Sequence, residues 1–103
     1  MIIYNKAVRD LIPDIIARAG KTCRVEILPP GEFQAKLDEK LTEELQEYLA
    51  TGDVAELADL VEVVYGILEM KGITLAEFEQ LRLTKKQERG GFSKRAFLVS
   101  VEE

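Results

Sequence analysis

The sequence predicts a mainly α-helical fold: a helical bundle completed by oligomerisation, with a small antiparallel β-ribbon beside it. Two long stretches, residues 32–50 and 53–71, carry apolar side chains at helical spacing and are separated only by a short Thr-Gly turn. The second stretch is apolar around much more than one face. A chain of 103 residues has few other elements to cover that surface, so we expect a homodimer or a tetramer.

The shorter elements follow from their end signals. A short helix is predicted at residues 9–19, where Pro13 is tolerated because it falls in the first turns. Residues 22–28 alternate and are rich in β-forming residues, which predicts a strand. Thr74 and Glu77 have the spacing of a capping box, so a fourth helix is predicted from there to residue 89.

The C-terminal residues 95–101 alternate again, after a break at Gly90-Gly91. Their simplest partner is the strand predicted at residues 22–28, which gives the antiparallel ribbon. The sequence has no repeat, linker or low-complexity segment. One domain covering residues 1–103 is therefore predicted.

Composition excludes several kinds of chemistry. The chain has no histidine, which removes imidazole bases, Ser-His-Asp and Cys-His catalysis, and histidine-based zinc sites. The single cysteine, Cys23, cannot form an internal disulfide and is typical of a reducing cytoplasm. The net charge of −5 argues against nucleic-acid binding. Without an apolar run of membrane-spanning length or a signal-peptide pattern, we expect a cytoplasmic protein that does not bind membranes.

Two acidic clusters, Glu43-Glu44-x-x-Glu47 and Glu56-x-x-Asp59, lie in the two long helical stretches. At about 100° per residue, Glu44 projects within the apolar stripe of its helix and Glu47 lies on the edge. Glu43 projects about 100° away from Glu44 and is predicted to be solvated. Glu56 projects among apolar side chains, with Asp59 about 60° to one side. A carboxylate in such a setting must be neutralised, paired or bound to a cation.

A metal site is the favoured interpretation of these clusters, because a short turn makes the two helices antiparallel neighbours. Carboxylate oxygens favour Mg²⁺, with Mn²⁺ as a substitute. Two structural alternatives stay open. The carboxylates could form a buried ion-pair network with Lys or Arg from elsewhere, or Glu56 could merely complete a capping box with Asp53.

Three sequence elements together resemble the MazG-like, or phosphoribosyl-ATP pyrophosphohydrolase-like, all-α nucleotide pyrophosphatases. They are Tyr4-Asn5-Lys6-x-Val8-Arg9-Asp10-x-Ile12-Pro13, the two acidic clusters, and Arg89-Gly90-Gly91-Phe92 followed by Arg95. The resemblance spans almost the whole chain and implies a single MazG-like nucleotide pyrophosphohydrolase domain. It also implies that Mg²⁺ is bound by Glu44, Glu47, Glu56 and Asp59. The chain departs from the family in having only eight residues between Glu47 and Glu56, which shortens the loop between the helices.

We therefore expect a Mg²⁺-dependent hydrolase that cleaves a nucleoside triphosphate or a related nucleotide between the α- and β-phosphates, giving a monophosphate and pyrophosphate. The four acidic residues would hold the metal, and one of them would orient the attacking water. Basic residues near both ends of the chain are candidates to bind the triphosphate tail. They are Lys6, Arg9, Lys85, Arg89 and Arg95.

Two functional alternatives stay open. One is hydrolysis of phosphoribosyl-ATP, which shares the metal chemistry and differs in its sugar pocket. The other is a non-catalytic helical dimerisation or interaction domain with the same fold. For the N-terminal motif, the structural alternative is that Tyr4, Val8 and Ile12 pack while Lys6 and Arg9 are solvated.

Overall fold

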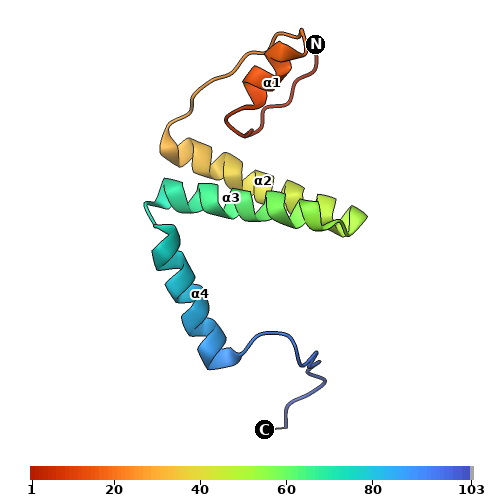
Figure 1. Cartoon of the computed structure of the whole chain (residues 1–103), viewed down its shortest axis with the longest axis vertical. Helices are drawn as coiled ribbons and strands as arrows, with labels where there is room; N and C mark the ends of the chain where they lie inside the picture. Colours follow the sequence, from red (N-terminus) through yellow and green to blue (C-terminus); the bar gives the residue numbers. More distant parts are fainter. Residues whose placement is uncertain (103) are drawn as a thin grey trace. The chain divides into compact units, whose positions relative to one another are not determined.

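The computed structural model describes residues 1–102, and four α-helices lie in that range (Figure 1). In chain order they are α1 (Ile12–Arg18), α2 (Pro30–Thr51), α3 (Val54–Lys71) and α4 (Leu75–Arg89). The mainly helical fold predicted from the sequence is confirmed. The chain divides into two compact units, Met1–Ile73 and Thr74–Glu103, and each is described by itself.

The first unit is organised by α2 and α3, which pack side by side in antiparallel directions (Figure 1). Gly52 ends α2 in the left-handed conformation, with a φ of 68° that residues with a side chain rarely adopt. Asp53 caps α3, because its Oδ1 accepts a hydrogen bond from the Ala55 N–H at 3.0 Å. This short turn brings the C-terminal half of α2 beside the N-terminal half of α3. The two acidic clusters are therefore neighbours.

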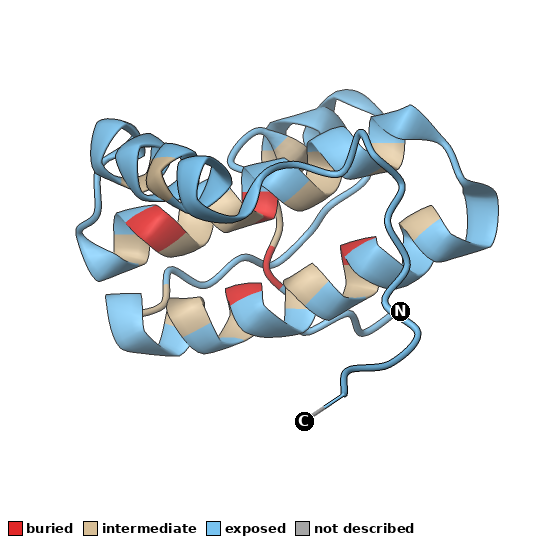
Figure 2. Ribbon diagram, turned by 90° about the horizontal axis from the view of Figure 1, so that it is seen from below, coloured by how far each residue is buried: buried red, intermediate tan, exposed pale blue. Residues whose placement is uncertain are grey.

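The core of the first unit is small. Ala7, Leu37 and Val63 are its buried members, and Leu37 of α2 comes so close to Gly66 of α3 that a Cβ there would lie 3.3 Å from a Leu37 methyl carbon. Partly buried side chains extend this contact on the two helices, namely Phe33, Leu41, Ile67 and Met70. Most of the ribbon is exposed, and the buried positions are few (Figure 2). Ala7 belongs to the N-terminal segment, so that segment is part of the core.

The helix α1 is shorter than the predicted span of residues 9–19. It begins at Ile12, with Pro13 in its first turn, and Gly20 follows it with a φ of 80°. Residues 1–9 are irregular, and Tyr4 is 68% exposed, so the structural alternative in which this aromatic side chain packs is wrong for Tyr4.

The second unit contains α4 and the residues that follow it. The predicted cap is confirmed, since Thr74 Oγ1 accepts a hydrogen bond from the Glu77 N–H at 3.1 Å. The helix ends at Arg89, and Gly90 follows with a φ of 84°. No residue of α4 is buried.

The predicted β-ribbon is not formed within residues 1–102. Residues 22–28 and 95–101 are both without strand structure. Their large side chains are mostly exposed, as Ile27 at 93% and Phe97 at 87% show. An isolated two-stranded ribbon is marginal in water unless one face is covered, and alternation alone does not supply that cover. Of the helices described, none is long and apolar enough to cross a membrane.

Candidate metal centre

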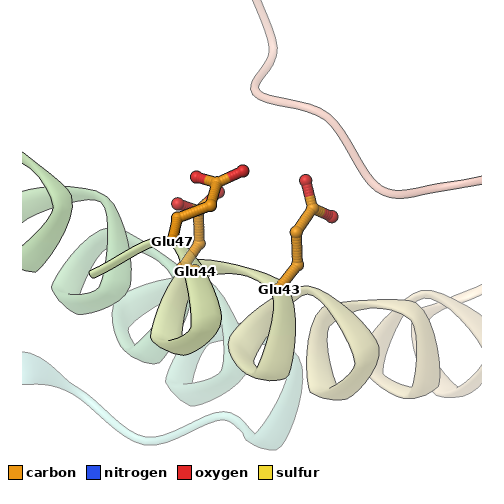
Figure 3. A group of neighbouring side chains, drawn as sticks. All are labelled: Glu43, Glu44 and Glu47. Atoms are coloured by element: carbon orange, nitrogen blue, oxygen red, sulfur yellow. The ribbon is translucent and has the colours of Figure 1, made fainter. Parts of the chain in front are cut away.

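The acidic clusters meet around Glu44. Glu44 of α2 lies with Glu56 and Asp59 of α3 so that one carboxylate oxygen of each falls within 4.8 Å of the others. Glu44 also belongs to a second such group with Glu43 and Glu47 on its own helix (Figure 3). The structure thus gathers the four predicted ligands about one shared residue.

Glu44 is the most constrained member of this group. The residue is 7% exposed, and its Oε2 is buried without a hydrogen-bond partner among the described residues. Its Oε1 lies 3.5 Å from the Lys40 Nζ. Burial, and then the neighbouring Glu47, raise the pKa of Glu44 above its ordinary value. A buried carboxylate oxygen without a partner is costly, so this atom is suited to a cation.

Glu43 differs from its neighbour. Its Oε1 accepts a hydrogen bond from the Lys6 Nζ at 2.9 Å and lies 3.9 Å from the Lys40 Nζ. The hydrogen bond from Lys6 lowers the pKa of Glu43. In Figure 3 the Glu43 side chain stands apart from those of Glu44 and Glu47. The helical projection separated Glu43 from Glu44 correctly, but Glu43 is ion-paired rather than simply solvated.

The acids of α3 face the same region. Partial burial and the charge of Asp59 raise the pKa of Glu56. Asp59 is paired, because its Oδ1 accepts a hydrogen bond from Arg9 at 2.8 Å. The capping-box alternative for Glu56 is wrong: the Asp53 N–H donates to Thr51 Oγ1 at 3.1 Å instead of to Glu56. Glu56 is therefore free to face the other acids.

A pocket of about 250 Å³ opens beside Glu44 and Asp59. Its lining combines basic, apolar and acidic side chains, which are Lys6, Val8, Arg9, Ile12, Lys40, Glu44 and Asp59. Two of the predicted phosphate-binding residues, Lys6 and Arg9, are thus brought to the acidic cluster. Such a lining suits a ligand that carries both negative charge and a metal ion.

Lys40 is the pocket residue that the sequence interpretation missed. Its side chain is 14% exposed and faces the carboxylates of Glu43 and Glu44. The signal was present in the sequence, since a lysine four residues before a buried glutamate lies on the same helical face.

The balance of acidic and basic side chains around Glu44 shows whether the site suits a metal ion. The five carboxylates of the two groups are matched by three cations, Lys6, Arg9 and Lys40, which leaves two negative charges in excess. The ion-pair alternative is thus realised only in part, because Glu47 and Glu56 have no ion pair within residues 1–102. One divalent cation would balance the remainder. The oxygen ligands and the unpartnered Glu44 Oε2 fit Mg²⁺ or Mn²⁺.

The other predicted phosphate-binding residues lie in the second unit. Lys85 and Arg89 belong to α4, and Arg95 follows it with a φ of 55°. Their contact with phosphate stays a prediction.

A scan against models of protein families, a search of curated proteins and a search of solved structures gave no match to this chain. The likeness to MazG-like pyrophosphohydrolases therefore rests on the motifs quoted above. The single MazG-like domain stays a prediction.

Proposed function

We propose that this protein is a Mg²⁺-dependent nucleotide pyrophosphohydrolase. It would cleave a nucleoside triphosphate or a related nucleotide between the α- and β-phosphates. The observation that carries the proposal is the buried Oε2 of Glu44, which has no hydrogen-bond partner among the described residues. It lies where two acidic groups meet, beside a pocket lined in part by cations. An ion-pair network alone would satisfy that oxygen.

Glu44, Glu47, Glu56 and Asp59 would hold the metal. A bound Mg²⁺ supplies neutralisation of phosphate charge and lowers the pKa of water. Glu47 and Glu56 have no cationic partner among the described residues, so they are the carboxylates available to take a proton from the attacking water. The new bond joins the water oxygen to the α-phosphorus, and the bond to the bridging oxygen of the β-phosphate breaks.

Lys6, Arg9 and Lys40 would neutralise the departing pyrophosphate. All three line the pocket beside Glu44, and the planar guanidinium of Arg9 is suited to bidentate contact with phosphate. Lys6 and Arg9 donate hydrogen bonds to carboxylates, whereas the Lys40 ammonium makes none within residues 1–102. Lys40 therefore has donors available for a phosphate oxygen.

The test is a panel of nucleotides, with phosphoribosyl-ATP included, assayed with Mg²⁺ and with Mn²⁺. We expect pyrophosphate and a nucleoside monophosphate in equal amounts. The Glu44→Gln variant is the control for contaminating activity. Stoichiometric orthophosphate would contradict the cleavage position, and no turnover of any nucleotide would favour a non-catalytic domain.

We further propose that the chain is a homo-oligomer, at least a dimer, in which α2 and α3 pair with those of a second copy. On α3, apolar residues at helical spacing are exposed, namely Val54, Leu57, Val61 and Tyr65. They share one face, and a second copy would cover it. Light scattering across a dilution series should give at least twice the chain mass of 11.6 kDa. A stable and active monomer would contradict this.

A further inference from the structure

The N-terminal segment crosses the helix pair and is fixed to both helices. Lys6 Nζ donates to Glu43 Oε1 of α2 at 2.9 Å, and Arg9 Nη2 donates to Asp59 Oδ1 of α3 at 2.8 Å. Between them, Ala7 is 5% exposed and packs in the core. We call residues 4–10 the N-terminal strap. Two ion pairs to opposite helices hold it on either side of one buried alanine.

Two further features lie next to the contact of Lys6 with α2. Asn5 has a φ of 47°, in the left-handed region that asparagine enters more readily than most residues. The Lys6 ammonium lies 5.7 Å from the centre of the Tyr4 ring, within cation–π range. Lys6 is thus held between an aromatic ring and a carboxylate.

The strap forms one wall of the pocket beside Glu44. Lys6, Val8 and Arg9 line that pocket, whereas Glu43 does not. Glu43 therefore meets the pocket through two lining residues: Lys6, which donates a hydrogen bond to it, and Lys40, whose Nζ lies farther away at 3.9 Å. If Lys6 lost its partner on α2, the cations that line the pocket would be less well placed, because side-chain order is maintained by such contacts.

We propose that Glu43 is a positioning residue that holds the strap through Lys6 and so sets the affinity of the pocket for a phosphate ligand. This inference rests on the proposed function, because the phosphate is the ligand of the proposed enzyme. Glu43 does not bind the metal. Its Oε1 already faces two ammonium groups, those of Lys6 and Lys40, whereas Glu44 keeps an oxygen without a partner.

A double-mutant cycle with Lys6→Gln and Glu43→Gln tests the proposal. The first probe is Mn²⁺ alone, whose binding is measured by the decrease in the electron paramagnetic resonance signal of the free ion. The second is manganese pyrophosphate, titrated by calorimetry. We expect each single variant to weaken pyrophosphate binding by about threefold to fivefold, the range for an exposed ion pair. The double variant should be no weaker than either single variant. The affinity of Glu43→Gln for Mn²⁺ alone should stay within about twofold of wild type.

Glu39→Gln is the matched control. Glu39 lies on the same helix, one turn before Glu43, and pairs with Lys36 at 3.2 Å outside the pocket. It should change neither affinity. Backbone order parameters from ¹⁵N relaxation supply a second measurement, in which Glu43→Gln should lower the order parameters of residues 6–10 and Glu39→Gln should not.

Three results would overturn the proposal. A loss of Mn²⁺ affinity in Glu43→Gln would make Glu43 a metal ligand. Weaker pyrophosphate binding in Lys6→Gln but not in Glu43→Gln would show that Lys6 acts without its anchor. Unchanged order parameters in the strap would show that Glu43 does not hold it. A wild-type protein that binds neither probe would contradict the proposed function, and the order parameters would then decide alone whether Glu43 holds the strap.

Discussion

On α4 an acidic side chain lies three residues from a basic one, whereas on α2 and on α3 acidic side chains lie three residues from each other. On α4, Glu79 lies three residues before Arg82, whose Nε donates to its Oε2 at 3.0 Å. The hydrogen bond from Arg82 lowers the pKa of Glu79. On the helix pair, burial raises the pKa of both Glu44 and Glu56, with neighbouring acids adding to it.

The difference lies in where the compensating charge comes from. On α4 the cation is three residues away on the same helix, and both partners are about half exposed. At the helix pair, the acids of two helices lie together with too few cations to balance them, and one carboxylate oxygen is buried without a hydrogen-bond partner in residues 1–102. An acidic cluster therefore favours a metal only where nearby cations are too few to balance it.

The largest effect should come from removing divalent metal. With EDTA, nucleotide turnover should fall to background, and excess Mg²⁺ or Mn²⁺ should restore it, because five carboxylates face only three cations. The measurement is pyrophosphate release before and after metal replacement. Robust turnover in EDTA would mean that the acids of the helix pair, like Glu79, bind no metal that turnover needs.

Glu44→Gln should be the most damaging single substitution. Activity should fall by more than about 100-fold, since loss of a metal ligand costs more than loss of the groups that support it. The metal-free variant should melt a few degrees higher than wild type, because a buried charge with a raised pKa is removed. Steady-state kinetics and thermal denaturation check both parts. Unfolding of Glu44→Gln would instead support a structural ion pair with Lys40.

The stability of the metal-free protein should depend on Glu44 and pH in a defined direction. The pKa of Glu44 is raised above 4.5 in the folded state, so just above that pH the folded protein binds more protons than the unfolded chain. Its contribution to the free energy of unfolding therefore falls as pH rises through the raised value. Glu43, with a lowered pKa, acts in the opposite direction.

Urea denaturation on both sides of pH 4.5 separates the two neighbours, because the Glu43 effect falls at and below that pH and the Glu44 effect falls above it. The stability of Glu44→Gln, relative to wild type, should increase as pH rises, and that of Glu43→Gln should decrease. If the free energy of unfolding changed with pH equally in both variants, the two adjacent glutamates would not differ electrostatically.

The helix ends and the acidic face could be predicted from sequence because local rules determine them. Thr74 and Asp53 cap their helices as such residues do, and Gly52 ends α2 in the conformation that glycine favours. The projection that placed Glu44 on the apolar side depends only on helical geometry. Its burial in the structure agrees with that projection.

The remaining features depend on contacts that no local rule supplies. Lys6 reaches Glu43 across 37 residues, and Arg9 reaches Asp59 across 50, so their pairing could not be read from spacing. The prediction of strands at residues 22–28 and 95–101 was wrong for a related reason. An alternating sequence forms a strand only where a partner strand and a covered face exist.

The smallest effect should come from Glu79→Gln, which removes an acid that is paired with a base on its own helix in the second unit. Glu79 and Arg82 are each about half exposed and lie on a helix with no buried residue, so water replaces the lost contact readily. We expect nucleotide turnover and Mn²⁺ affinity to match wild type and the melting temperature to fall by no more than about 3 °C. A loss of activity comparable to that of Glu44→Gln would mean that α4 contributes an acid to the site. The contrast between a locally neutralised helix and a charge-rich helix pair would then be wrong.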